Sequence, residues 1–183
     1  MLGIALREVR EDMGWARRVI AGMVHVSESL VNEWEHGRRT ISDSLKQVLA
    51  RKLNSGKLCM SLKHEATGGV MAAPYLDGEN MDNHRLVCID RTIEEMEEAV
   101  AALRLLQPIF RLPPGRVAED QRQLIASRMM EVIEADTAAE NMLARVARDY
   151  GLSLPELYDQ HQAELIEKGY LEKEKSPQKR AAV

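Results

Sequence analysis

The chain has 183 residues, of which 45% are hydrophobic, 30% charged and only 4% aromatic, and its formal net charge is −4. This composition argues against a disordered chain and against a nucleic-acid surface that covers the whole molecule. The sequence has no apolar run of 18 residues, no secretory signal and only two cysteines, Cys59 and Cys88. We therefore expect a soluble cytoplasmic protein with no disulfide framework and no membrane association.

The charge is unevenly distributed along the chain. Residues 1–53 carry nine Lys and Arg against seven Asp and Glu, whereas the remainder carries sixteen against twenty-two. The sign of this difference fits an N-terminal part that binds an anion and a remainder that stays in solution.

Residues 1–55 are predicted to form a domain of four short helices. The first helix has its apolar residues at helical spacing and ends before Gly14, and the second covers residues 17–24. Ser27 is placed to cap a third helix, which reaches Glu35 and ends at Gly37. Thr40 with Asp43 resembles a capping box that opens a fourth helix through about residue 53.

Residues 56–91 are rich in Gly, Pro, Asn and Asp, and we expect an irregular connector there. Short strands around residues 86–89 are an open alternative. The predicted C-terminal domain covers residues 92–172, and residues 173–183 are expected to be a frayed tail. The fold class predicted for the whole chain is all-α, with a helical bundle as the C-terminal domain.

The C-terminal domain opens with "TIEE" at residues 92–95, which predicts a capping box. A helical stripe comes next, and its members are Ile93, Met96, Val100 and Leu103. Prolines at 108, 113 and 114 indicate the next corner. "SLPE" at residues 153–156 is expected to cap a last helix.

The longest predicted helix runs from about residue 116 to Tyr150 and carries a heptad-like seam. Its apolar members are Ile125, Met129, Val132, Ala139, Leu143, Val146 and Tyr150, with Asp136 as a polar member. The seam is either the core stripe of a helical bundle or the surface at which two subunits of a homodimer meet. A further alternative is that the C-terminal helices bind a protein partner.

Residues 6–53, which begin with "LREVREDMGWARRVIAGMVHVSESLVNEWEHGRR", resemble the lambda-repressor-like, xenobiotic-response-element (XRE) class of helix-turn-helix regulators. The resemblance rests on Arg10, the Gly-Trp turn, the Val-Ser opening of the third helix and its Glu-x-Gly end. It implies a sequence-specific DNA-binding transcriptional regulator, repressor-like, that binds double-stranded DNA as a dimer on two half-sites about 34 Å apart. Segments such as "YLDGENMDNHRL" more weakly resemble phage or prophage regulators of Gram-positive bacteria.

The resemblance also implies roles for individual residues. Arg10 would pair with Glu35 and fix the register of the helices. The residues expected to face the bases are Ser27, Glu28, Ser29, Asn32 and Glu33. The residues expected near the phosphates are Arg17, His36, Arg38 and Arg39.

Two features depart from the family pattern. Glu28 and Glu33 place negative charge on the helix that would read the bases; a glutamate can accept a hydrogen bond from the amino group of cytosine, but it could also dock onto a protein. Ala16 lacks a capping side chain before the second helix, which forfeits about 1 kcal/mol. Three alternatives therefore stay open: a protein-interaction module, a DNA-packaging or adaptor subunit, and a plain helical packing unit.

Other chemistry is set aside. Cys59, His64, His84 and Cys88 lack the compact C-x2-C spacing that marks zinc sites, so no metal is expected. A self-cleaving repressor would need a β-rich domain with a serine nucleophile and a lysine base, and no phosphate-binding glycine motif occurs. We expect neither an enzyme nor a cofactor.

Overall fold

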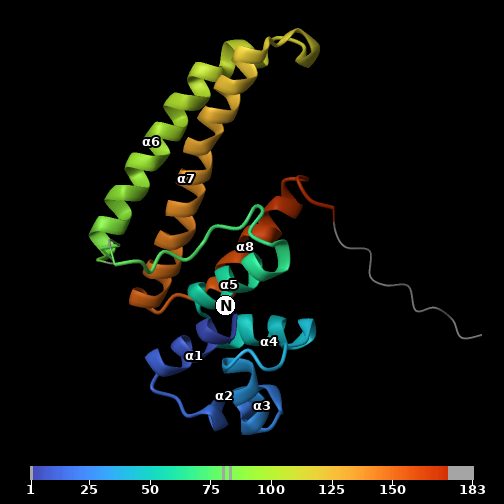
Figure 1. Cartoon of the computed structure of the whole chain (residues 1–183), viewed down its shortest axis with the longest axis vertical. Coiled ribbons are helices and arrows are strands. Elements are labelled where there is room, and N and C mark those ends of the chain that lie inside the picture. Colours follow the sequence, from blue (N-terminus) through green and yellow to red (C-terminus); the bar gives the residue numbers. More distant parts are fainter. Residues whose placement is uncertain (1, 80, 83, 173–183) are drawn as a thin grey trace, which may run out of the picture.

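The computed structural model describes residues 2–79, 81–82 and 84–172, and these form eight α-helices and one short 3-10 helix (Figure 1). They are α1 (Leu2–Asp12), α2 (Arg17–Val24), α3 (Glu28–Glu35), α4 (Asp43–Leu53), α5 (Gly56–Thr67), α6 (Arg85–Phe110), η1 (Pro114–Arg116), α7 (Glu119–Tyr150) and α8 (Leu154–Glu167). The predicted all-α class is confirmed for these residues. None of their helices combines the length and the apolar character needed to cross a bilayer.

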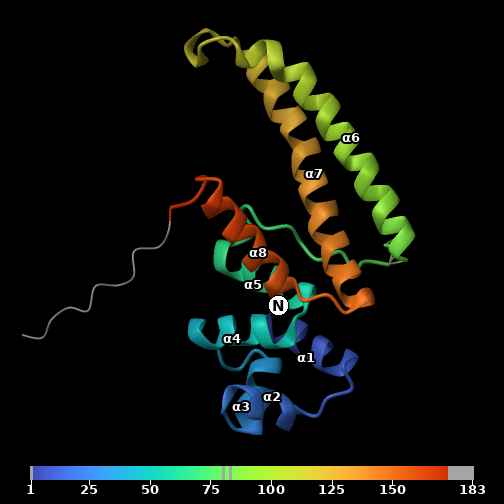
Figure 2. The same ribbon diagram turned by 180° about the vertical axis from the view of Figure 1, so that it is seen from behind.

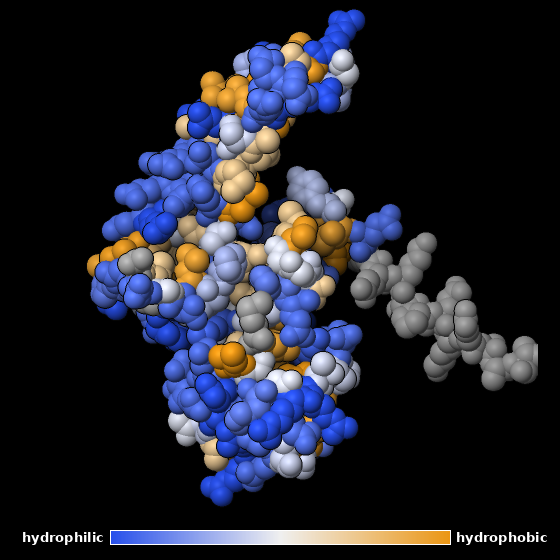
Figure 3. Space-filling view, viewed as in Figure 1, coloured by the Kyte–Doolittle hydropathy of each residue, from blue (hydrophilic) through white to orange (hydrophobic). Residues whose placement is uncertain are grey.

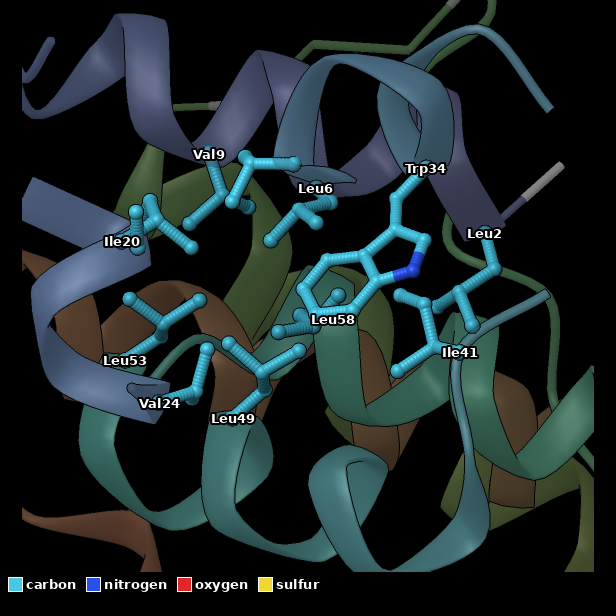
Figure 4. Close-up of a cluster of buried hydrophobic side chains, with 12 residues drawn as sticks. Leu2, Leu6, Val9, Ile20, Val24, Trp34, Ile41, Leu49, Leu53 and Leu58 are labelled. Carbon is cyan, nitrogen blue, oxygen red and sulfur yellow. The ribbon is translucent and has the colours of Figure 1, made fainter. Parts of the chain in front are cut away.

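Helices α1 to α5 enclose a core of large aliphatic side chains around Trp34 (Figure 4). Leu6, Ile20 and Val31 are fully buried in it. Burying a side chain of this size contributes about 1.5–3 kcal/mol. Leu58 of α5 belongs to the same core. The N-terminal unit therefore extends to α5 and does not end at residue 55.

The expectation of an irregular segment from residue 56 was wrong, because residues 56–67 form α5. Ser55 caps this helix by accepting a hydrogen bond from the Leu58 N–H at 3.3 Å. Gly56 has a packing role: a Cβ at this position would lie 2.2 Å from the Cβ of Ala144 in α7. The glycine that suggested a chain break instead allows two helices to approach each other.

The start of the next helix was also predicted incorrectly. Helix α6 begins at Arg85, so residues 86–89 are helical and not strands. Thr92 is buried inside the helix, where its single hydroxyl hydrogen is shared between the carbonyls of Cys88 at 2.7 Å and Ala138 of α7 at 3.2 Å. Pro108 does not end the helix, because buried Leu106 and Ile109 hold the chain against its neighbour on both sides of the proline.

Helix α4 begins later than the predicted capping box. Its N-cap is Ser42, and no side-chain hydrogen bond caps it. Ile41 is buried in the N-terminal core, which holds the preceding residues outside the helix. Thr40 is consequently too early in the chain to cap α4.

The C-terminal half is a hairpin and not the predicted bundle. Helices α6 and α7 lie side by side in both views and project away from α1 to α4 (Figures 1 and 2). Helix α8 turns back to the N-terminal unit, where Asp159 pairs with Arg51 of α4 at 2.8 and 3.0 Å. Asn54 fixes this return: its side chain donates to Leu152 O and accepts from the Leu154 N–H. The predicted tail, 173–183, lies outside the described residues.

Candidate nucleic-acid interface

A tight turn joins α2 to α3. His25 has a φ of 56°, in the left-handed region, and the N–H groups of His25 and Val26 both donate to the carbonyl of Ala21. Ser27 then caps α3 by accepting from the Leu30 N–H at 3.2 Å, as predicted. Ala16 precedes α2 without a side-chain cap, also as predicted. The two helices, each of eight residues, are thus set at a fixed corner.

Helix α3 has a buried inner face and an open outer face. Val31, Trp34 and Glu35 are buried. The residues expected to contact bases differ in exposure. Ser27, Glu28 and Ser29 are exposed, whereas Asn32 and Glu33 are half-buried. Both views place α2 and α3 at the end of the molecule farthest from the hairpin tip (Figures 1 and 2). No later helix among the described residues covers this outer face.

Glu35 joins three helices at one carboxylate. Arg10 of α1 donates to it through Nε at 2.5 Å and through Nη2 at 3.1 Å. Arg17 of α2 donates through Nε at 2.7 Å. The pair of Arg10 and Glu35 that the resemblance implied is therefore present. Since Glu35 is the last residue of α3, these bonds fix where α3 ends relative to α1 and α2.

The electrostatics of this cluster favour the charged forms. Burial alone would raise the pKa of Glu35, but the hydrogen bonds from Arg10 and Arg17 hold it below its ordinary value. The bond to Glu35 raises the pKa of Arg10 despite the cost of burial. Removing one partner from such a buried pair costs about 3–5 kcal/mol, because it leaves an uncompensated charge.

Arg17 was expected beside a phosphate, and the structure gives it another partner. Its guanidinium binds Glu35, while its side chain stays 36% exposed. Sequence reasoning assigned Glu35 to Arg10 alone. The i to i+18 separation of Arg17 and Glu35 carries no local signal that could have revealed this second bond.

The other expected phosphate contacts are exposed. His36, Arg38 and Arg39 come directly after α3, and Gly37, with φ of 66°, turns the chain between them as predicted. Arg39 lies 3.6 Å from Glu33, so it partly offsets the negative charge of that residue. Among the described residues Arg38 has no ion pair.

Gly3 is a positioning residue that sequence reasoning missed. A Cβ at this position of α1 would lie 2.0 Å from the carbonyl oxygen of Trp34. Helix α1 can therefore contact the backbone of α3 only because residue 3 has no side chain. A glycine near the start of a helix is the one signal that could have pointed to this contact.

The predicted seam on α7 is only partly buried. Ile125, Met129, Val132 and Val146 are half-buried, whereas Leu143 and Tyr150 are exposed. The helix buries mainly small residues instead, among them Ala135, Ala138, Ala144 and Ala147. The seam thus lies beside the alanine-rich face of α7, which packs against other helices of the same chain.

The cysteine and histidine residues do not gather. Cys88 is buried in α6 and Cys59 is half-buried in α5, where burial raises the pKa of its thiol. Within the described part of the chain, no three His, Cys, Asp or Glu side chains form a group that could hold a metal ion.

Comparisons with known protein families, with curated proteins and with solved structures give no match for this chain. The function of the α2–α3 end therefore has to be inferred from its own geometry and charge.

Proposed function

We propose that this chain is a sequence-specific DNA-binding regulator of transcription, in which α2 and α3 act as a helix-turn-helix and α3 enters the major groove. The observation that carries the proposal is that α3 is held firmly in place while its outer face is exposed. Its outer face is open at one end of the molecule, while its inner end is held by three hydrogen bonds on Glu35. A rigid helix with an uncovered polar face is what groove reading requires.

The outer face offers groups of both kinds that DNA binding needs. Ser27, Ser29 and Asn32 can donate to or accept from base edges, and Glu28 and Glu33 can accept from the amino group of cytosine. His36, Arg38 and Arg39 come next in the chain, and the arginines can bind phosphates regardless of sequence. Occupancy of an operator would then repress transcription by excluding polymerase.

The proposal is tested by selecting genomic fragments that the purified full chain retains, followed by binding to the enriched sequence at increasing salt. We expect enrichment of a defined site and an affinity that falls steeply as salt rises, because bound phosphates release counterions. Absence of DNA retention in dilute buffer would refute the proposal.

Two substitutions test the orientation of α3. Glu33→Ala should change which bases are preferred at one position of the site, by about 1–3 kcal/mol of discrimination. Arg38→Ala should weaken binding to every sequence alike and lower the slope of the salt dependence by about one. Equal effects of both changes on all sequences would contradict the assigned orientation.

A second candidate is a module in which α3 docks onto a basic protein surface. The specific observation in its favour is Glu28, which is exposed at the start of α3 and has no ion pair among the described residues. This function predicts no DNA binding at any salt concentration and a basic binding partner. Charge reversal at Glu28 would abolish that binding.

A further inference from the structure

Helix α6 exposes a continuous apolar stripe that the N-terminal unit does not cover. Its members are 36% to 58% exposed and recur at alternating spacings of three and four residues, apart from Gln107 near the end. They are Leu86, Ile89, Ile93, Met96, Val100, Leu103 and Phe110. A heptad pattern of this kind is typical of a helix that packs against another helix.

The stripe does not face α7. The residues of α6 that are buried are Cys88, Thr92, Ala99, Ala102, Leu106 and Ile109. Most stripe residues directly follow a position of the α7-facing row, so the stripe lies about 100° around the helix from it. The surface over the middle of α6 that Figure 3 shows is largely hydrophilic, as expected for the opposite side of the helix.

Near the hairpin tip, helix α7 adds the apolar residue Ile125 to the same face of the hairpin. Phe110 of the stripe and Ile125 of the α7 seam line one hollow at the hairpin tip. On the other face, Arg91 and Glu134 line a hollow together with Met81, which belongs to the segment between α5 and α6. The segment between α5 and α6 therefore covers one face of the hairpin, and no segment within residues 2–79, 81–82 and 84–172 covers the face that carries the stripe.

We propose that the stripe face of the α6–α7 hairpin binds a second copy of this chain, with the two α6 helices antiparallel about a two-fold axis, in a four-helix bundle. The spacing of the stripe supports an identical partner. Residues equally far from position 98 meet each other in such a pair: Met96 meets Val100, Ile93 meets Leu103 and Leu86 meets Phe110, while Ile89 meets the polar Gln107. A two-fold interface requires this self-complementarity.

The charges beside the stripe select the antiparallel orientation. Asp90, Glu97, Arg104 and Arg111 occupy one flank at intervals of seven residues and are exposed. The order acid, acid, base, base places Glu97 of one copy alongside Arg104 of the other when the helices are antiparallel. In a parallel pair this flank would instead face the α7 side of the other α6, so these charges would not meet. Charges that flank the apolar seam set orientation in this way in coiled coils.

The size of the face is sufficient for a dimer. Helix α6 has 26 residues. A helix of that length is about 39 Å long, and two helices side by side are roughly 20 Å wide, which gives a face of roughly 800 Å². Stable interfaces bury about 800 Å² on each partner.

The proposal is tested by sedimentation equilibrium of the full chain without DNA, so its result is independent of the proposed function. We expect a dimer that dissociates on dilution. Leu103→Glu should raise the dissociation constant at least about 100-fold, because a carboxylate is buried twice in each dimer. Leu105→Glu is the matched control: Leu105 is 53% exposed on the same helix but on the side away from the stripe, and its substitution should leave dimerisation unchanged.

A charge reversal tests the orientation. Glu97→Arg should weaken the dimer about tenfold, and combining it with Arg104→Glu should restore it, because the opposite charges then meet again. Circular dichroism checks that each variant keeps its helical content. A monomeric wild-type chain, a higher oligomer, loss of the dimer in Leu105→Glu, or no recovery in the double variant would each overturn the proposal.

Discussion

The N-terminal unit and the α6–α7 hairpin use their apolar residues in opposite ways. The first buries large side chains such as Leu6, Ile20 and Leu49. The hairpin buries mainly alanines between its helices and leaves large residues such as Met96 and Leu103 exposed. The N-terminal unit is thus complete within one chain, whereas the hairpin has close helix packing but an apolar face that no other described segment covers.

This difference shows that the periodicity of an apolar helical stripe does not identify the surface against which the stripe packs. The α6 stripe has the same periodicity as a core stripe, and the sequence alone could not distinguish the two. The packing of α6 against α7 distinguishes them. Alanines allow two helices to approach closely, so α6 and α7 pair mainly through them; of the large residues of α6, Leu106 and Ile109 are buried and the stripe residues are turned outward.

The largest effect is expected at the junction of α1, α2 and α3. Glu35→Gln should destabilise the N-terminal unit by about 3–5 kcal/mol in urea denaturation, because buried Arg10 loses the carboxylate of Glu35 and keeps only the exposed carboxylate of Glu11. Glu33→Gln, on the exposed side of the same helix, should change stability by less than about 0.5 kcal/mol. Similar losses in both variants would show that Glu35 does not join the helices.

The same carboxylate gives a pH dependence. The pKa of Glu35 lies below its ordinary value of 4.5, so the folded state holds the proton less tightly than the unfolded state. Its contribution to stability is complete above that ordinary value and is lost as the pH falls through the lowered one. Acid unfolding of the wild-type chain should therefore be steeper than that of Glu35→Gln, and equal slopes would contradict this sign.

The next prediction compares the N-terminal unit with the α6–α7 hairpin directly. Leu6→Ala should cost about 2–5 kcal/mol, because it leaves a cavity in the N-terminal core. Leu103→Ala should cost less than about 0.5 kcal/mol at concentrations where the chain is monomeric. The measurement is urea denaturation at low protein concentration; a large loss for Leu103→Ala there would show that the stripe is already buried within one chain.

A smaller effect is expected from two glycines. Gly3→Ala should destabilise the chain by about 1–3 kcal/mol, because the added Cβ collides with the carbonyl of Trp34. Gly22→Ala, in α2, meets nothing within 4 Å and should stabilise it by up to about 1 kcal/mol. Thermal unfolding followed by circular dichroism separates the two signs.

The smallest effects concern the helix caps. Ala16→Ser should stabilise the N-terminal unit by about 1 kcal/mol by supplying the missing cap of α2. Ser27→Ala should destabilise it by a similar amount, because Leu30 N–H loses its partner. Thermal unfolding of both variants measures the difference, and a loss of stability in Ala16→Ser would show that position 16 is restricted by something other than capping.

Local signals in the sequence were sufficient for much of the N-terminal unit. Ser27 as a cap and Gly37 as a stop depend on neighbouring residues only, and both were predicted correctly. The Arg10–Glu35 pair came from the family resemblance. The bond of Arg17 to Glu35 and the contact of Gly3 with Trp34 depend on how the helices cross, which spacing along the chain does not encode.

The errors around residues 56–92 have a common physical cause. Gly56 and Thr92 were interpreted by local preference, as a break and as a cap. Their actual roles are set by α7, since Gly56 admits the Cβ of Ala144 and Thr92 donates to the carbonyl of Ala138. Tertiary contacts outweigh local preference at both positions.

The placement of α3 at the end farthest from the hairpin tip has a consequence for the shape of an assembly (Figures 1 and 2). If two hairpins associate antiparallel, the pair of α3 helices lies at opposite ends and points in opposite directions. Such an assembly cannot occupy adjacent half-sites on a single straight duplex. If α3 binds DNA as proposed, the assembly would instead hold two separate operators together, and the DNA between them would form a loop while polymerase is excluded at each operator.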